Sequence, residues 1–205
     1  MLVIGLTGSI GMGKSAVAAH LRQRGIAVFD ADAEVHKLYQ GPAAQTIGLA
    51  FPGTVMSGVV DRSRLAQALG SDPSSFKRLE AIVHPLVWVA ERDFLRAAKL
   101  RGDKISVLEI PLLFEGGNEK KMDAVIVVSA PIEVQRRRVL ERDGMTETRL
   151  EDLLARQMPD SEKLRRADFV VDTGGTIAKT HTQTDIIIAK LSGWPALAFD
   201  RDWKT

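Results

Sequence analysis

The chain has 205 residues, of which 45% are apolar and 26% are charged, a composition typical of a folded globular protein with one sizeable core. It contains no cysteine, which excludes disulfides and thiolate metal sites and suits a reducing compartment. The net charge of +2 suits anionic substrates and is weak evidence for nucleic-acid binding. No apolar run approaches the roughly 18 residues that a membrane span needs.

Short apolar runs that do not alternate with polar residues recur along the chain and predict buried strands of a parallel sheet. The first run lacks a preceding basic region and is predicted as a strand, not as a secretion signal. Amphipathic patterns predict helices from Lys14 to Gly25 and from Ile132 to about Arg142. The alternation indicates a three-layer α/β fold with a five-stranded sheet and helices on both faces. The predicted strands are Leu2–Leu6, Ala27–Phe29, Ile105–Leu108, Ala124–Val128 and Phe169–Val171.

Roughly seventy-five residues separate the second and third predicted strands, far more than a simple crossover needs. The excess predicts a helical domain at 33–101, inserted into a sheet domain formed by 1–32 and 102–205. A shorter excess at about 141–167 predicts a lid. The tail from Ser192 has no clear periodicity and is expected to be loosely ordered. The helices predicted in these segments are Ala33–Gln40, Arg62–Leu69, Ser74–Leu100 and Thr146–Met158, the last of which Pro159 is expected to end.

The first predicted strand leads into a glycine-rich segment that matches the pattern G-x-x-x-x-G-K-[ST] and precedes a predicted helix. Its glycines let backbone N–H groups converge on phosphate oxygens, and the positive end of the helix points at the same anion. Lys14 supplies a cation for the β- and γ-phosphates, and the Ser15 hydroxyl can ligate Mg²⁺. The motif predicts a nucleoside triphosphate but not the reaction, because kinases, GTPases and motor ATPases share it. The segment comprises Gly8, Ser9, Ile10, Gly11, Met12, Gly13, Lys14 and Ser15, and Ala16 follows it.

Two carboxylates, Asp30 and Asp32, follow the second predicted strand. Ligands of open α/β sheets bind at the carboxyl ends of strands, so one of the two could take the proton from an attacking hydroxyl. The alternative is that either residue caps the helix that runs toward Gln40. Both interpretations can hold, one for each residue.

Glu109 falls at the carboxyl end of the third predicted strand, and its carboxylate could hold magnesium-bound water or a substrate group. The apolar stretch after it contains Leu112 and Phe114 and either lines a substrate pocket or belongs to the core. His84 precedes Pro85 inside a long helical pattern, where proline is expected to break or kink the helix. A histidine at a kink can face a pocket, but from the residues alone a structural role is favoured.

Arginines gather in the last third of the chain. Arg138 and Arg142 are four residues apart and share one face of a helix. Arginine in a lid can neutralise charge on a transferred phosphoryl group, whereas the alternative is a solvated helix face with ion pairs to Glu133, Glu141 and Asp143. The solvated face is favoured for any single arginine, and at least one of Arg138 and Arg142 is expected to act on phosphate.

Six segments in this order resemble the bacterial dephospho-CoA kinase family, and the resemblance covers nearly the whole chain. The glycine loop occurs in many families, whereas the ordered set of the other five segments is specific. Three positions depart from the common pattern: Ala16 and Thr173 stand where Thr and Asn are frequent, and Glu109 stands where Asp is more usual. The segments are 5–15, 30–32, 82–87, 110–115, 142–144 and 167–172.

The resemblance implies a P-loop fold and a kinase that uses ATP and Mg²⁺ to phosphorylate the 3′-hydroxyl of dephospho-CoA, the last step of CoA synthesis. It implies that Asp32 is the base and that Thr7, Lys14 and Arg142 surround the transferred group. It further implies a nucleotide-binding core, a helical CoA domain at 33–101 and a lid. On the acceptor side it places Asp32, His84, Glu109, Leu112 and Phe114, and on the nucleotide side it adds Arg138, Asp172 and Gly174 to the loop.

A cytoplasmic protein is expected, as a monomer or weak homo-oligomer with no nucleic-acid or membrane partner. Another small-molecule kinase, of the nucleotide or shikimate type, would share the loop and lid but lack the His-Pro and Pro-Leu-Leu-Phe-Glu segments. A GTP-binding switch would usually carry an Asn-Lys-x-Asp motif, which the sequence lacks. A nucleic-acid ATPase is disfavoured by the small charge excess and by the supply of only three tryptophans and one tyrosine for base stacking.

Overall fold

The computed structural model describes residues 1–70 and 72–204 and contains two compact units. One unit combines Met1–Phe29 with the chain from Leu95 onward, and the other is Asp30–Phe94. The boundaries that the sequence predicts for the insertion are 33 and 101, whereas the second unit ends inside a long helix, before Leu95.

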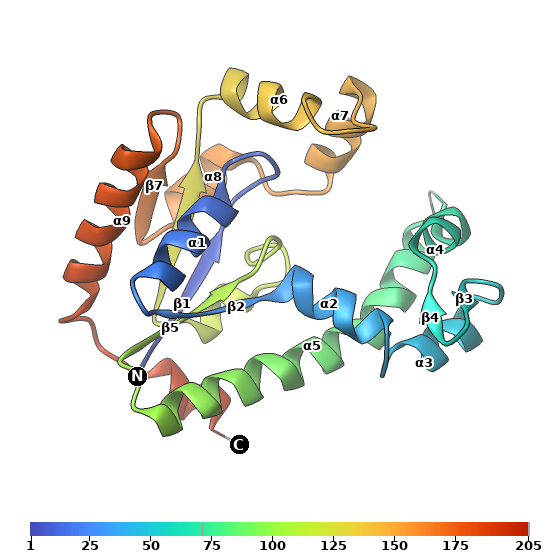
Figure 1. The fold of residues 1–205 in the computed structure, drawn as a ribbon, viewed down its shortest axis with the longest axis horizontal. Coiled ribbons are helices and arrows are strands. Elements are labelled where there is room, and N and C mark those ends of the chain that lie inside the picture. The colour runs from blue at the N-terminus through green and yellow to red at the C-terminus, as the bar shows by residue number, and fades with distance from the viewer. Residues whose placement is uncertain (71, 205) are drawn as a thin grey trace. The chain divides into compact units, whose positions relative to one another are not determined.

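The first unit contains a five-stranded sheet in the order β2-β5-β1-β6-β7 (Figure 1). β1 pairs in parallel with β5 and β6, and β6 pairs in parallel with β7. All five predicted strands are confirmed, and each extends one residue further at its carboxyl end. Because β1 is central, the loop after it lies in the middle of the carboxyl edge of the sheet. The strands are β1 Leu2–Thr7, β2 Ala27–Asp30, β5 Ile105–Glu109, β6 Ala124–Ser129 and β7 Phe169–Asp172.

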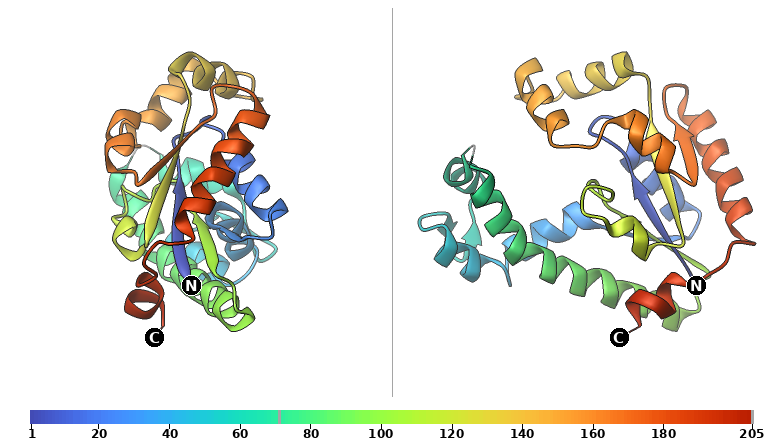
Figure 2. Two further views of the ribbon diagram at one scale, coloured as in Figure 1. Left: turned by 90° about the vertical axis from the view of Figure 1, so that its left-hand side faces the viewer. Right: turned by 180° about the vertical axis from the view of Figure 1, so that it is seen from behind.

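Two helices, α1 Lys14–Gln23 and α9 Ile177–Leu191, pack against each other and against one face of the sheet (Figures 1 and 2). Val17 and Leu21 of α1 meet Ile187 of α9 in a core that also takes the side chains of alternate residues of β1. Burial of each of these apolar side chains stabilises the folded state by about 1.5–3 kcal/mol. The packing fixes α1 against β1 and therefore fixes the loop that joins them.

The predicted helix after β6 is confirmed as α6 Ile132–Leu140, and the arginine-rich segment that follows contains two helices where the sequence predicts one. The predicted helix Thr146–Met158 is observed as α7 Glu147–Ala155 with Thr146 as its N-cap. The prediction that Pro159 ends that helix is wrong, because α7 already ends at Ala155 and Pro159 is the N-cap of α8 Asp160–Arg166. Proline at the start of a helix loses no intrahelical hydrogen bond, which explains the second helix.

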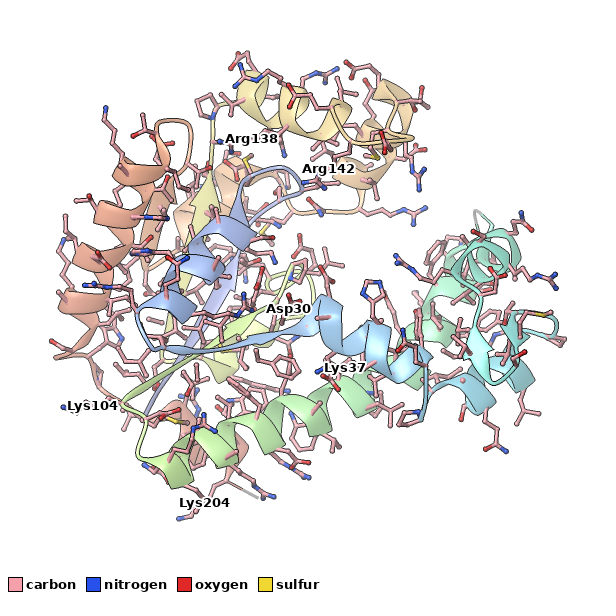
Figure 3. All side chains as sticks on the ribbon, in the orientation of Figure 1. Asp30, Lys37, Lys104, Arg138, Arg142 and Lys204 are labelled. Carbon is pink, nitrogen blue, oxygen red and sulfur yellow. The ribbon has the colours of Figure 1, made fainter. Side chains whose placement is uncertain are left out.

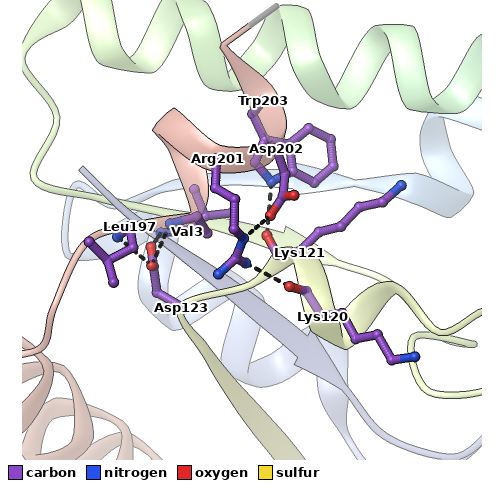
Figure 4. A network of polar contacts seen from close by, with 9 residues as sticks. Val3, Lys120, Lys121, Asp123, Leu197, Arg201, Asp202 and Trp203 are labelled. Atoms are coloured by element: carbon purple, nitrogen blue, oxygen red, sulfur yellow. Dashed lines mark hydrogen bonds and ion pairs between the residues drawn. The ribbon is translucent and has the colours of Figure 1, made fainter.

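The expectation of a loosely ordered tail is wrong for the described residues, because residues 197–203 pack against other parts of the first unit (Figure 4). Phe199–Trp203 forms a short π-helix, and Trp203 is only 1% exposed. Its indole Nε1 donates to the carbonyl oxygen of Lys121 at 2.9 Å, next to the 3₁₀-helix Asn118–Lys121. Asp123 accepts hydrogen bonds of 2.7 Å from the backbone N–H groups of Leu197 and Ala198. These partners lie about eighty residues away in the sequence, so no local pattern could reveal them.

The second unit has its own apolar core. Its helix α4 has the predicted bounds, whereas α3 and the hairpin β3–β4 are not predicted. The long helix α5 runs through Pro85 without a break, so of the two predicted effects the break is wrong and the kink stays a prediction. Proline removes one N–H, and the packing of Val83 and its neighbours in this core maintains the helix around it. The elements are α2 Ala31–Tyr39, α3 Ala44–Ala50, β3 Val55–Met56, β4 Val59–Val60, α4 Arg62–Leu69 and α5 Pro73–Arg101.

Among the described helices, none combines the length and the apolar character that crossing a membrane requires.

Candidate active site

The glycine loop between β1 and α1 adopts a conformation that its glycines require. Gly11 and Gly13 have φ angles of 78° and 84°, in the left-handed region that side chains disfavour. A Cβ atom on Gly8 would lie 2.5 Å from the carbonyl oxygen of Val128. Gly13 is the N-cap of α1, and none of the described side chains caps that helix. The first-turn N–H groups of α1 are therefore available to an anion.

Lys14 and Glu109 form a buried ion pair at the loop. The Nζ of Lys14 lies 2.7 Å from Oε1 of Glu109, and the Glu109 side chain is only 3% exposed. Arg22 approaches the second carboxylate oxygen at 3.4 Å from the solvent side. Because β5 is the neighbour of β1, the carboxyl end of β5 brings Glu109 beside the loop. The pair holds the Lys14 ammonium at the start of α1, where the triphosphate of a nucleotide would lie.

Thr7 is buried at the end of β1, and its hydroxyl donates to the carbonyl oxygen of Pro111 at 3.1 Å. This bond joins the start of the glycine loop to the turn after β5. A contact between Thr7 and a phosphoryl group stays a prediction, and the observed role of the hydroxyl is to connect the two loops.

Thr173 links the glycine loop to α6. Its hydroxyl donates to the carbonyl oxygen of Met12 at 2.6 Å. Arg138 donates to the same hydroxyl at 3.1 Å and to the Thr173 carbonyl oxygen at 2.7 Å. The alternative of a solvated face is therefore wrong for Arg138 (Figure 3), which is half-buried and bonded next to the loop. Thr173, which stands where Asn is frequent in similar sequences, therefore has a structural role of its own.

The segment after β7 is tightly turned. The carboxylate of Asp172 accepts from the Gly174 N–H at 2.7 Å. A Cβ atom on Gly174 would lie 2.5 Å from Pro131, at the entrance to α6, so the two segments touch there. The adenine contacts predicted for Asp172 and Gly174 stay a prediction.

Arg142 lies in the turn after α6 and is exposed to solvent (Figure 3). Arg136 of α6 forms an ion pair with Glu147 of α7. The acidic partners that the sequence suggests for these arginines are Glu133, Glu141 and Asp143. An exposed guanidinium suits a group that reaches its ligand only after a lid closes. The predicted contact of Arg142 with the transferred phosphoryl group stays a prediction.

Two glutamines that the sequence does not single out contact the middle of the loop. Gln135 of α6 donates to the carbonyl oxygen of Ile10, and Gln157, between α7 and α8, accepts from the Ile10 N–H. No sequence motif links a glutamine at a fixed distance to a glycine loop of this kind. Only the folded chain brings these residues together.

The sequence predicts that the apolar stretch after β5 either lines a substrate pocket or belongs to the core, and its residues differ in burial. Phe114 is buried under the guanidinium of Arg166, whose Cζ lies 4.7 Å from the ring centroid, so in this structure it belongs to the core. Its predicted contact with the substrate stays a prediction. Leu112 is 42% exposed and remains available to a ligand. Glu115 pairs with Lys163 of α8 at 3.0 Å.

In the second unit, Asp30 accepts a hydrogen bond from the Ala33 N–H at 2.9 Å and is the N-cap of α2. Capping therefore accounts for Asp30, while Asp32 lies exposed in the first turn of the same helix. His84 is exposed on α5, directly before Pro85. The catalytic role of Asp32 and the substrate contact of His84 stay predictions.

The donor atoms beside the loop suit magnesium. The Ser15 hydroxyl is exposed at the start of α1, and the Glu109 carboxylate lies at the end of β5. Hard oxygen ligands of this kind, with phosphate oxygens, are what Mg²⁺ prefers. Residues 1–70 and 72–204 contain no group of three or more acidic or histidine side chains that could hold a metal.

Comparisons with known proteins agree with this geometry. The family described as dephospho-CoA kinase matches residues 2–179. The chain belongs to the dephospho-CoA kinase family. A dephospho-CoA kinase from Mesorhizobium japonicum is 51% identical over 193 residues, which cover 94% of this chain and 98% of the relative.

Solved structures of similar proteins support the family fold. The crystal structure of TT1252 from Thermus thermophilus has a TM-score of 0.80 at 36% identity and covers 94% of this chain and 98% of its own. A dephospho-CoA kinase from Campylobacter jejuni has a TM-score of 0.70 at 25% identity, with 93% of this chain and 96% of its own covered. The predicted P-loop kinase fold is thereby confirmed.

Proposed function

We propose that the protein transfers the γ-phosphate of ATP to the 3′-hydroxyl of dephospho-CoA, giving CoA and ADP, the final step of CoA biosynthesis. Membership of the dephospho-CoA kinase family is the observation that carries this proposal. The glycine loop with its buried Lys14–Glu109 pair supplies the chemistry that a phosphoryl donor needs.

The loop and α1 hold the donor. Backbone N–H groups around Gly11 and Gly13 and the positive end of α1 bind the β- and γ-phosphate oxygens. Lys14, aimed by Glu109, stabilises the charge that grows on the oxygens of the transferred group. Ser15 and Glu109 would hold Mg²⁺, which when bound offsets the charge of the phosphates.

Asp32 activates the acceptor. Its carboxylate takes the proton of the 3′-hydroxyl as the hydroxyl oxygen attacks the γ-phosphorus, and ADP leaves. His84 and Leu112 contact dephospho-CoA, and the 33–101 region forms the acceptor domain. Arg142 reaches the transferred phosphoryl group when the 141–167 lid closes, and Arg138, Asp172 and Gly174 border the nucleotide.

We place the enzyme in the cytoplasm as a monomer or weak homo-oligomer that depends on magnesium and needs no nucleic acid. Sedimentation of the pure protein across a range of concentrations tests the oligomeric state. Loss of turnover with a chelator, restored by magnesium, tests the dependence on magnesium.

An acceptor panel tests the function. The pure protein with MgATP and, separately, dephospho-CoA, shikimate or a nucleoside monophosphate is followed by ADP release. The expected result is ADP release with dephospho-CoA at least about a hundred times faster than with the other acceptors. Faster turnover of shikimate or of a nucleoside monophosphate would overturn the assignment of the acceptor.

A further inference from the structure

Ile10, in the middle of the glycine loop, is held by hydrogen bonds on both sides of its backbone. Its N–H donates to Oε1 of Gln157 at 3.1 Å, and its carbonyl oxygen accepts from Nε2 of Gln135 at 2.7 Å. The first bond fixes the Ser9–Ile10 peptide group, and the second fixes the Ile10–Gly11 peptide group. Two successive peptide planes of the loop are thus set by side chains from outside it.

A glycine-rich loop needs such support. Gly11 is in the left-handed region, and glycine populates many backbone conformations at little cost. Rotation of the Ile10–Gly11 peptide plane would turn the Gly11 N–H group away from the anion that the loop binds, and rotation of the Ser9–Ile10 plane would displace the residues that follow it in the loop. Each carboxamide contact removes that freedom before ligand arrives, so less ordering entropy is lost on binding.

Gln157 stands on a fixed part of the 141–167 segment. The N–H of the next residue, Met158, donates to Oε1 of Glu115 at 2.7 Å. The ammonium of Lys163, which is 0% exposed, lies 3.0 Å from the same oxygen. Glu115 follows β5, so these two contacts attach the chain around Gln157 to the sheet unit. The side chain that holds Ile10 is therefore anchored to the sheet unit through Glu115.

We propose that Gln157 is a positioning residue for the donor site: by holding the Ser9–Ile10 peptide it preorganises the glycine loop for the triphosphate of ATP. The inference rests on the proposed function for the identity of the nucleotide. It adds to that function a residue that contacts neither substrate and acts through the loop backbone.

The test replaces Gln157 by Met, which keeps the length of the side chain and removes the acceptor for the Ile10 N–H. The Kd for ATP by calorimetry and the KM for ATP should both rise about five- to tenfold, which corresponds to one lost hydrogen bond. The KM for dephospho-CoA should stay within about twofold. A purely structural role would instead lower the active fraction, and hence kcat, and leave both values for ATP unchanged.

The matched control is Glu151→Gln on α7, at an exposed position of the same segment. It should leave both ATP values within about twofold of the wild type. If Gln157→Met does not fold, Gln157→Asn keeps the amide but withdraws its oxygen by one methylene, and the same rise is expected.

Unchanged ATP affinity in the folded variant would overturn the inference. Tighter ATP binding would also overturn it, because Gln157 would then compete with a phosphate oxygen for the Ile10 N–H. The calorimetric measurement of ATP binding does not depend on the acceptor. A wild-type protein that binds ATP but forms no CoA would therefore refute the proposed function, and the comparison with Gln157→Met would still test the role of Gln157.

Discussion

Lys14 and Glu109 lie 2.7 Å apart across the ends of β1 and β5, and this pair sets the position of the ammonium at the mouth of the glycine loop. Replacing Glu109 by Gln removes the charge that aims Lys14 and exchanges one of the two oxygen ligands expected for magnesium, a carboxylate, for a weaker neutral amide. We expect kcat to fall about a hundredfold, because small misplacements of a catalytic group have effects of that size. Steady-state ADP release measures it.

Arg22→Gln is the matched control for that pair. Arg22 contacts the same carboxylate at 3.4 Å, but its side chain is 42% exposed, so solvent screens the interaction. Its loss should change kcat less than about threefold. Equal effects of the two substitutions would contradict the claim that Glu109 acts mainly through its hold on Lys14.

Asp32 and Asp30 differ in what they do at the start of α2. Asp32→Asn should lower kcat about a hundredfold or more, the usual contribution of a general base, and change the Kd for ATP less than about threefold. Asp30→Asn should leave turnover within about threefold, because Asn caps a helix as well as Asp does. Near-normal turnover of the Asp32 variant would remove it from the role of base.

Closure of the arginine-rich arm should be visible by hydrogen exchange. Addition of ATP should slow exchange in 141–156, which includes Arg142 and α7. Exchange in 157–167 should change little, because Glu115 already holds that part through Met158 and Lys163. Unchanged exchange throughout 141–167 would contradict a lid.

The N-terminal end of α5 carries a pH-dependent contribution to stability. Hydrogen bonds from Ser74 and Ser75 lower the pKa of Asp72 from 3.8 to about 2. Because the pKa is lower in the folded state, ionised Asp72 stabilises that state above about pH 4, and the contribution is lost as the pH falls toward 2. The difference in unfolding free energy between wild type and Asp72→Asn should therefore be larger at pH 6 than at pH 3, as urea titrations at the two values can measure. A difference that does not depend on pH would contradict the assignment.

The parts of the site that the sequence predicts are those encoded in contiguous residues. Gly8 to Ser15 specify a turn and a helix start within a few residues, and the apolar runs around them specify the strands. Asp30 shows the limit of this reasoning, since a carboxylate after a strand fits both a cap and a base until its bond to the Ala33 N–H is seen.

The parts that the sequence could not predict depend on distant partners. Trp203 is buried against a backbone carbonyl about eighty residues earlier, and Gln157 meets a loop near the other end of the chain. Phe114 has the same apolar character whether it lines a pocket or fills a core, and only the packing of Arg166 over it decides. The helix through Pro85 shows tertiary packing overriding a local helix breaker.

The most direct test of the account is the identity of the product. The pure protein is incubated with MgATP and dephospho-CoA, and the product is analysed by mass and by phosphorus NMR. The account predicts CoA that carries a new phosphate on the ribose 3′-oxygen, formed in equal amount with ADP. ADP formation without a phosphorylated acceptor, or a phosphate at another position, would contradict it.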